Sequence, residues 1–140
     1  MTTTQTKALL TFLLLGSISA ADERLVTAAR QQVGVTVDYD ASYLPIPYPG
    51  GDVPGETGTC ADVVVRALRV LGLDLQKEIH EDMRRHFSAY PARRMWGQKR
   101  PDRNIDHRRV PNLEVFFERI GWSVTETPTD NPADYLPGDI

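Results

Sequence analysis

The chain has 140 residues and a formal net charge of −3 at pH 7, with 19 acidic residues against 16 lysines and arginines. This balance and a hydrophobic content of 41% are typical of a soluble globular protein and neither demand nor exclude an acidic partner. The residues that follow a predicted leader, 22–140, suffice for one domain of common size and exclude two.

The amino-terminal residues have the three parts of a secretory signal peptide. TTTQTK contains one cation and no acid, ALLTFLLL is apolar, and GSISAA is made of small residues. The apolar run is too short to cross a bilayer, which takes ~20 residues. We therefore predict that residues 1–21 are a signal peptide, that the protein is periplasmic or secreted, and that no stable membrane span remains after cleavage before Asp22.

The first predicted helix covers residues 22–33. It has acids in its first turn and an apolar side, and Gly34 ends it. The apolar side consists of Leu25, Val26, Ala29 and Val33. Residues 35–40 are predicted as a short strand, and residues 41–58 as a long loop rich in Pro and Gly, a kind of loop that is usually functional or disordered.

The second predicted helix begins at Cys60 or Ala61 and ends at Leu71, with Gly72 as its C-cap. Helical spacing predicts an inward stripe that starts with the thiol at the first turn. This stripe consists of Cys60, Val64, Ala67, Leu68 and Leu71. The opposite side is predicted to face water, and it consists of Asp62, Arg66 and Arg69.

Two more helices are predicted farther along the chain. The third has Asp74 as N-cap, acids early and cations late, and its apolar positions are Leu75, Ile79, Met83 and Phe87. Residues 88–109 show neither the helical nor the strand period of apolar residues and are predicted as a basic loop. The fourth helix opens near Pro111 and ends at Gly121. Residues 122–128 are predicted as a strand.

Cys60 is the only cysteine of a chain predicted to meet oxidants outside the cytoplasm. Such a thiol is buried and inert, paired between two chains, or kept free for reactivity. The start of a helix favours the thiolate through its unpaired N–H groups and the positive end of the dipole. Free cysteine is also among the most buried residue types, so the nucleophile and the core residue both stay open.

A nucleophilic cysteine needs a base, and the base needs a group that orients it. Of the three histidines, His107 is the best candidate, with Asn104 and Asp106 close in sequence; the competing interpretation is a histidine that anchors a loop by hydrogen bonds. His80 and His86 lie six residues apart, on different helix faces, whereas the zinc motif H-E-x-x-H spaces its histidines by four. We predict neither a metal site nor a cofactor.

Cations are concentrated in residues 84–109. This segment contains nine lysines and arginines and two acids, which leaves seven cations and seventeen acids for the other residues. A solvated face is one interpretation, and arginine contacts with carboxylates or phosphates are another. Export and the absence of a pattern of stacking aromatics exclude nucleic acid, so peptidoglycan or another anionic envelope component is the expected partner.

Four long motifs carry a resemblance to a known family. They are G-G-D-V-P, T-C-x-D-V-V-x-R-A, H-E-D-M and N-I-D-H-R-R-V-P-N-L. With them the chain resembles, from about residue 28 to residue 140, a bacterial family catalogued as domain of unknown function 1287. That family is in turn distantly similar to the papain-like group that includes the NlpC-type peptidoglycan peptidases.

The resemblance implies an α+β fold in which a helix that begins with the nucleophilic cysteine, here Cys60, packs on a small antiparallel sheet. In such proteins the histidine base follows a P-G-D turn. This chain stops at Pro137-Gly138-Asp139-Ile140, so the resemblance implies a domain truncated at its carboxyl end, with most of the sheet missing and the base beyond Ile140.

The leading hypothesis from the sequence is an exported cysteine hydrolase or amidase that acts on cell-wall peptide bonds. Cys60 would attack the carbonyl, with His107 as the base available within the chain, and Asp62, Arg108 and Arg109 would bind the substrate. The loop 39–58 would wall the cleft. The alternative is a binding module without catalysis that uses residues 84–109 on anionic cell-wall material or a protein partner, and a third is an envelope protein joined through a Cys60 disulfide.

Overall fold

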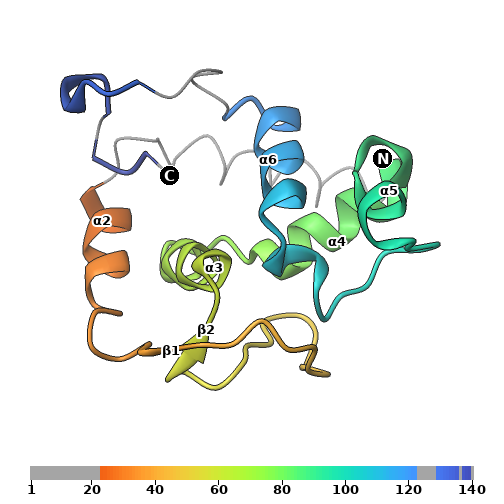
Figure 1. Ribbon diagram of the computed structural model, residues 1–140, viewed down its shortest axis with the longest axis horizontal. Coiled ribbons are helices and arrows are strands. Elements are labelled where there is room, and N and C mark those ends of the chain that lie inside the picture. The colour runs from red at the N-terminus through yellow and green to blue at the C-terminus, as the bar shows by residue number, and fades with distance from the viewer. Residues whose placement is uncertain (1–22, 123–128, 136, 140) are drawn as a thin grey trace, which may run out of the picture.

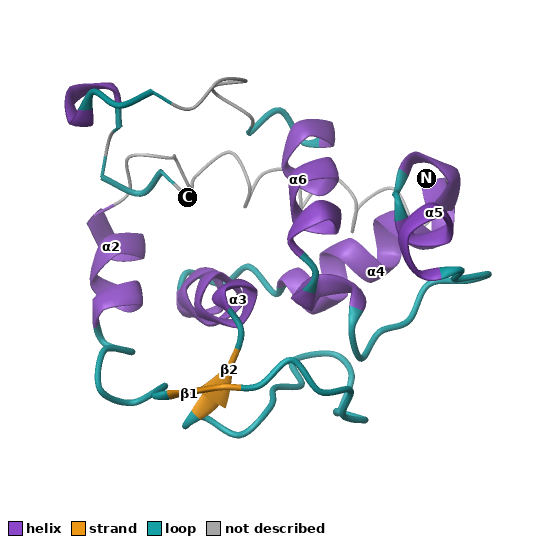
Figure 2. Cartoon of the chain, viewed as in Figure 1, coloured by secondary structure: helices purple, strands orange, loops and turns teal. Residues whose placement is uncertain are grey.

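The structure is a computed structural model that describes residues 23–122, 129–135 and 137–139. The predicted signal peptide and most of the strand predicted at 122–128 lie outside these residues. Figures 1 and 2 show helices joined by long loops and one small sheet. The elements are α2 (Glu23–Arg30), β1 (Asp38–Tyr39), β2 (Thr57–Gly58), α3 (Cys60–Val70), α4 (Leu75–His86), η1 (Phe87–Ala89), α5 (Ala92–Trp96), η2 (Asp106–Arg108), α6 (Val110–Arg119) and η3 (Pro132–Asp134).

Helix α3 lies at the centre of the molecule. In Figure 1 it is seen nearly end-on, with α2 on one side, α4 and α6 on the other, and the two strands below. The short 3-10 turn η2 contacts α3, α4 and α6, so it joins the three helices. This mixture of helices with a small sheet confirms the prediction of an α+β fold at that level. No helix among the described residues is long and apolar enough to span a membrane.

The sheet is parallel, which contradicts the predicted antiparallel arrangement for the described strands. β1 pairs with β2 in the register Asp38 to Thr57 and Tyr39 to Gly58. Parallel neighbours require a long connection that returns the chain to the same end of the sheet, and residues 40–56 provide it. The predicted strand at 35–40 is confirmed only over its two residues in β1.

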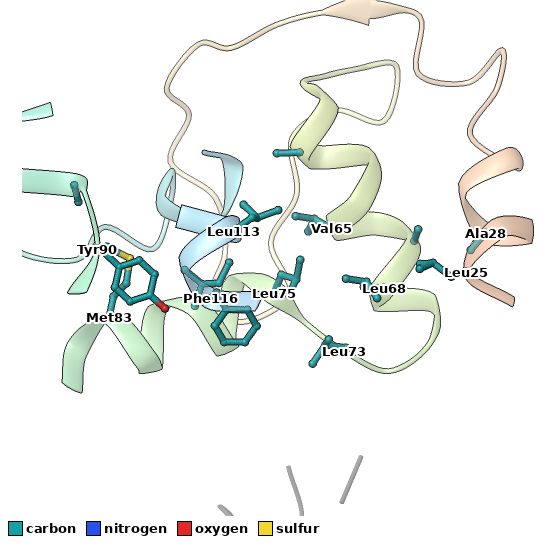
Figure 3. Close-up of a cluster of buried hydrophobic side chains, with 14 residues drawn as sticks. Leu25, Ala28, Val65, Leu68, Leu73, Leu75, Met83, Tyr90, Leu113 and Phe116 are labelled. Carbon is teal, nitrogen blue, oxygen red and sulfur yellow. The ribbon is translucent and has the colours of Figure 1, made fainter. Parts of the chain in front are cut away.

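The hydrophobic core follows the helical periods of α3 and α4. Leu68, Leu75, Ile79 and Met83 have no exposed surface, and Figure 3 shows side chains of α2, α3, α4 and α6 converging on one cluster. The predicted apolar side of the third helix is therefore confirmed. Phe87, its last position, is partly buried against the same cluster.

Helix α3 ends as its sequence predicts. The N–H of Gly72 donates to the carbonyl of Arg69, and the N–H of Leu73 donates to that of Leu68. Gly72 has a φ of +91°, and this left-handed residue with its two backward hydrogen bonds forms a Schellman motif. The motif buries Leu73 (4% exposed) at the entrance to α4.

Two predictions about helices are wrong. The first helix was expected to reach Val33, but α2 ends at Arg30 and Val33 is 82% exposed, because a series of turns follows in which no neighbouring element covers it. The basic loop predicted at 88–109 contains α5 and η2. Helix α5 has only five residues, too few for an apolar period to show in the sequence.

Truncation of the most central side chain should measure the contribution of the core. We expect Leu68→Ala to lower the free energy of unfolding by about 2–5 kcal/mol, because it removes a fully buried side chain and leaves a cavity. Val70→Ala in the same helix is the control, since Val70 is 72% exposed and should change stability by less than about 0.5 kcal/mol. Urea titrations of both variants measure the difference, and equal losses would contradict this description of the core.

Candidate functional site

Cys60 is the first residue of α3, and its side chain is exposed to solvent. The predicted inward stripe that began with the thiol is therefore wrong at its first position. Ala67 and Leu68 of the predicted stripe are buried as expected, but at the start of α3 the buried positions are Ala61 and Val65, each one residue after the predicted Cys60 and Val64. Among the described residues, the Cys60 side chain makes no hydrogen bond, so the thiol is open to a reactant.

The backbone around Cys60 offers free donors. The first N–H groups of a helix have no partner within the helix, and the hydrogen bonds found for residues 23–122 use neither the N–H of Cys60 nor that of Ala61. An exposed thiol therefore sits beside two backbone donors at the positive end of a helix dipole. Backbone donors in such a position can stabilise an oxyanion.

Asp62 lies one helical turn inside α3 and is buried, with 1% of its surface exposed. The prediction that it faces water with Arg66 and Arg69 is wrong. Its Oδ2 accepts hydrogen bonds from the backbone N–H of Thr59, at 2.6 Å, and from the Thr59 hydroxyl, at 3.0 Å. The carboxylate therefore caps the helix from its third position. The Gly58 backbone lies close to this carboxylate, and a Cβ at position 58 would come within 3.1 Å of Asp62.

The same carboxylate forms a buried ion pair with Arg108 of η2. Arg108 Nε donates to Asp62 Oδ1 at 2.9 Å, and Arg108 Nη2 donates to Oδ2 at 3.1 Å. The guanidinium also donates to the carbonyls of Asp40 and Ser42. Both side chains are 2% exposed. The structure thus brings together Asp62 and Arg108, two predicted substrate-binding residues, but uses them to hold three segments of the chain and not to face a substrate.

Arg109, the third predicted substrate-binding residue, is half-buried and has other contacts. Its Nη1 donates to Gln98 Oε1 at 2.6 Å, and its guanidinium carbon lies 4.0 Å from the centre of the Trp96 ring. Asp106 stays 4.0 Å away. Burial lowers the pKa of Arg109, because its guanidinium lies against the Trp96 ring and is partly removed from water.

His107, the predicted base, is 2% exposed, and its Nδ1 has no hydrogen-bond partner among the described residues. Removal from water disfavours the imidazolium and lowers the pKa of His107 to about 4. The ring is therefore neutral at pH 7. No described hydrogen bond joins it to Cys60, so the structure does not assemble the predicted pair of nucleophile and base.

The two predicted orienting residues hold the loop around His107. Asn104 accepts a hydrogen bond from the N–H of Ile46 and donates to the Tyr43 hydroxyl. Asp106 is 1% exposed and accepts from the Gln98 amide and the N–H of Asp102. Burial raises the pKa of Asp106. These contacts favour the competing interpretation, in which this part of the chain is an anchored turn.

The remaining histidines have separate environments. His80 packs edge-on against Tyr48, with ring centres 5.2 Å apart, and its pKa is lowered by burial. His86 is exposed and lies 3.0 Å from the Asp82 carboxylate. Within the described residues, no three His, Cys, Asp or Glu side chains gather at one point where a metal ion would bind.

Sequence reasoning missed Gln76, which fixes the loop that was expected to wall a cleft. Its Oε1 accepts from the N–H of Gly51, and its Nε2 donates to the carbonyls of Pro47 and Arg103. At Gly51 the backbone is so close to Pro47 that a Cβ would lie 2.0 Å from the Pro47 oxygen. The loop is therefore an ordered layer over α3 and α4. No local pattern marks such a long-range contact, whereas T-x-x-D at Thr59 is a capping signal that would have placed Asp62.

A comparison with known protein families identifies the chain. The sequence profile of domain of unknown function 1287 matches residues 26–140. The chain belongs to this family. It is also 54% identical over 116 residues to the uncharacterized protein YijF of Escherichia coli strain K12.

The alignment with YijF covers 83% of this chain and 55% of the relative. The chain therefore spans about half the length of the curated relative that it matches. No solved structure matches this member of the 1287 family. Its family is thus established by sequence. Asp62 and Arg108, which form the buried pair, both lie in the sequence motifs T-C-x-D-V-V-x-R-A and N-I-D-H-R-R-V-P-N-L.

We expect Arg108→Met to lower the free energy of unfolding by about 3–5 kcal/mol, because it leaves the Asp62 carboxylate buried without its counter-charge. The matched control is Lys77→Met, which breaks a partly exposed pair with Glu81 one turn along α4 and should cost less than about 0.5 kcal/mol. Denaturant titration at pH 7 measures both. Losses of equal size would show that the buried pair has no special weight.

Burial of neutral His107 predicts a pH-dependent stability. The unfolded chain takes up a proton near pH 6.5 and the folded chain only near pH 4, so stability is complete above pH 6.5 and falls as the pH is lowered through this window. The loss attributable to His107 is about 3 kcal/mol.

The measurement is the free energy of unfolding of wild type and His107→Gln between pH 7 and pH 4. The slope of the wild type should exceed that of the variant, and the difference isolates His107 from Asp106, whose raised pKa acts in the opposite sense. Identical slopes would contradict a neutral, buried imidazole.

Proposed function

We propose that this chain belongs to an exported cysteine hydrolase that cleaves amide bonds of cell-wall peptides, with Cys60 as the nucleophile. The observation that carries the proposal is the exposed thiol at the first position of α3. A cysteine kept only as a core residue would be buried, and this one is not. Periplasmic or secreted localisation, as expected from residues 1–21, is part of the proposal.

In the proposed reaction, Cys60 Sγ attacks the carbonyl carbon of the amide. The oxygen becomes negative as the S–C bond forms, and the free N–H groups of Cys60 and Ala61 would donate to it. The C–N bond then breaks, the amine leaves with a proton, and water hydrolyses the thioester to release the acid and the thiol. The thiol proton passes through the base to the leaving amine, and the two N–H donors belong to the first turn of α3.

The proposal gives His107 no proton-transfer step, since its ring is buried and has no hydrogen bond to Cys60. The base would be a histidine in the part of the family that this chain does not span, as the papain-like arrangement implies. A papain-like fold remains a proposal for the whole protein; it is supported by α3, which starts with the cysteine, and by the adjacent strand β2.

The test is hydrolysis of purified peptidoglycan fragments by the whole protein, so that the proposed base is present, followed by mass spectrometry of the products. We expect the whole wild-type protein to release peptides with new amino and carboxyl ends, Cys60→Ala to release none, and the wild-type mixture quenched in acid to contain a thioester adduct on Cys60.

Val70→Ala is a suitable control for the handling of variants, because it changes an exposed residue at the far end of the same helix. It should keep full activity. Absence of products from the wild type, or products that persist in Cys60→Ala, would each refute the hydrolase.

A further inference from the structure

We propose that a hollow between the end of α4, α5 and the start of α6 binds a ligand that carries two or more phosphate or carboxylate groups. This site goes beyond the proposed hydrolase, because Cys60 is not among its lining residues and no chemistry at the thiol is needed. Figure 1 shows α5 beside α4, away from the start of α3.

The hollow has a volume of about 960 Å³, within the usual range for small-molecule sites. Two pairs of arginines line it, one from the last turn of α4 and one from α5. They are Arg84, Arg85, Arg93 and Arg94. Glu114 is the acid among the lining residues, and Phe87, Tyr90 and Val115 provide an apolar part. The lining therefore combines four positive charges with one negative charge.

These four arginines differ from most others in the chain. Arg66, Arg108 and Arg119 are each paired with an aspartate. Among the described residues, no ion pair or side-chain hydrogen bond engages Arg84, Arg85, Arg93 or Arg94. Within the basic segment, four of the cations thus surround a hollow, whereas Arg108 holds the fold.

The acid that precedes the first arginine pair on α4 is already paired. Asp82 lies two and three residues before Arg84 and Arg85, but its carboxylate accepts from Arg119 at 2.7 Å, from the Tyr90 hydroxyl at 2.6 Å and contacts His86. Arg119 and the other contacts lower the pKa of Asp82 to about 2, against the effect of burial. Like charges that gather in excess of their counter-charges destabilise a fold, and a bound anion would offset this cost.

The backbone that carries the arginines is fixed by the core. Tyr90 is 4% exposed and Ala92 is fully buried, so they anchor η1 and α5. Gly97, with a φ of +64°, follows Trp96 and caps the end of α5. The second arginine pair therefore stands on a short but anchored helix opposite the first. Such preorganisation lowers the entropic cost of binding.

The chemistry of the lining identifies the ligand class. A guanidinium donates two parallel hydrogen bonds to one carboxylate or phosphate. Four guanidinium groups exceed what one singly charged group can engage, and the lining retains a net charge of +3 after Glu114 is counted. A multiply charged oxyanion with an apolar portion fits this surface.

Isothermal titration calorimetry of the full chain tests the site, with tripolyphosphate, citrate and acetate as probes in about 0.15 M salt, where exposed charges are screened over ~8 Å. We expect tripolyphosphate or citrate, or both, to bind and acetate not to bind measurably. Tripolyphosphate alone indicates a phosphate ligand, and citrate alone a carboxylate ligand. Binding of neither would overturn the proposal.

Two double variants localise the binding. Arg85→Gln with Arg93→Gln removes one cation from each side of the hollow, and Lys99→Gln with Arg100→Gln removes the same charge from exposed cations outside its lining. We expect the first to weaken binding about 10-fold or more and the second less than about 2-fold. Equal losses would overturn the site and show attraction by general charge. Unchanged melting temperatures without ligand would exclude a folding effect.

Discussion

The buried pair of Asp62 and Arg108 is the constraint on which the rest of the structure depends. The Asp62 carboxylate accepts four hydrogen bonds, two from Thr59 and two from Arg108. It thereby fixes the start of α3, while Arg108 fixes η2 and the loop that follows β1. Two charges removed from water require this degree of hydrogen bonding, and the positions of all three segments follow from it.

The pair also explains the position of the candidate nucleophile. Because Asp62 turns inward at the third position of the helix, Cys60 is rotated to the solvent side. The cap leaves the N–H groups of Cys60 and Ala61 without a partner among the described residues. The exposed thiol and the buried carboxylate therefore both follow from the motif T-C-x-D. The arginine hollow lies on other elements, so the proposed binding there and the proposed chemistry at Cys60 can be tested separately.

Local patterns predicted the helices that form the core but not the contacts that bring them together. The apolar period of α4 and the glycine after α3 specify their elements directly. The local T-x-x-D cap marks Asp62, but its ion-pair partner is 46 residues away in sequence and no local pattern reveals that pair. Val33 was misplaced because a helical period alone does not show which neighbour covers it. His107 was a reasonable base on composition, yet burial, which no short motif records, separates it from the thiol.

The proposed function requires that Cys60 is an accessible nucleophile at the start of α3. The most direct test is the rate of alkylation by iodoacetamide at pH 6, followed by intact mass, for the folded protein and for the protein in denaturant. Because the chain has a single cysteine, each adduct reports on this thiol. We predict that the folded protein reacts at least as fast as the chain in denaturant, because the thiol of Cys60 is exposed at the first position of α3. A folded protein that reacts more slowly than the unfolded chain, or not at all, would contradict an accessible nucleophile.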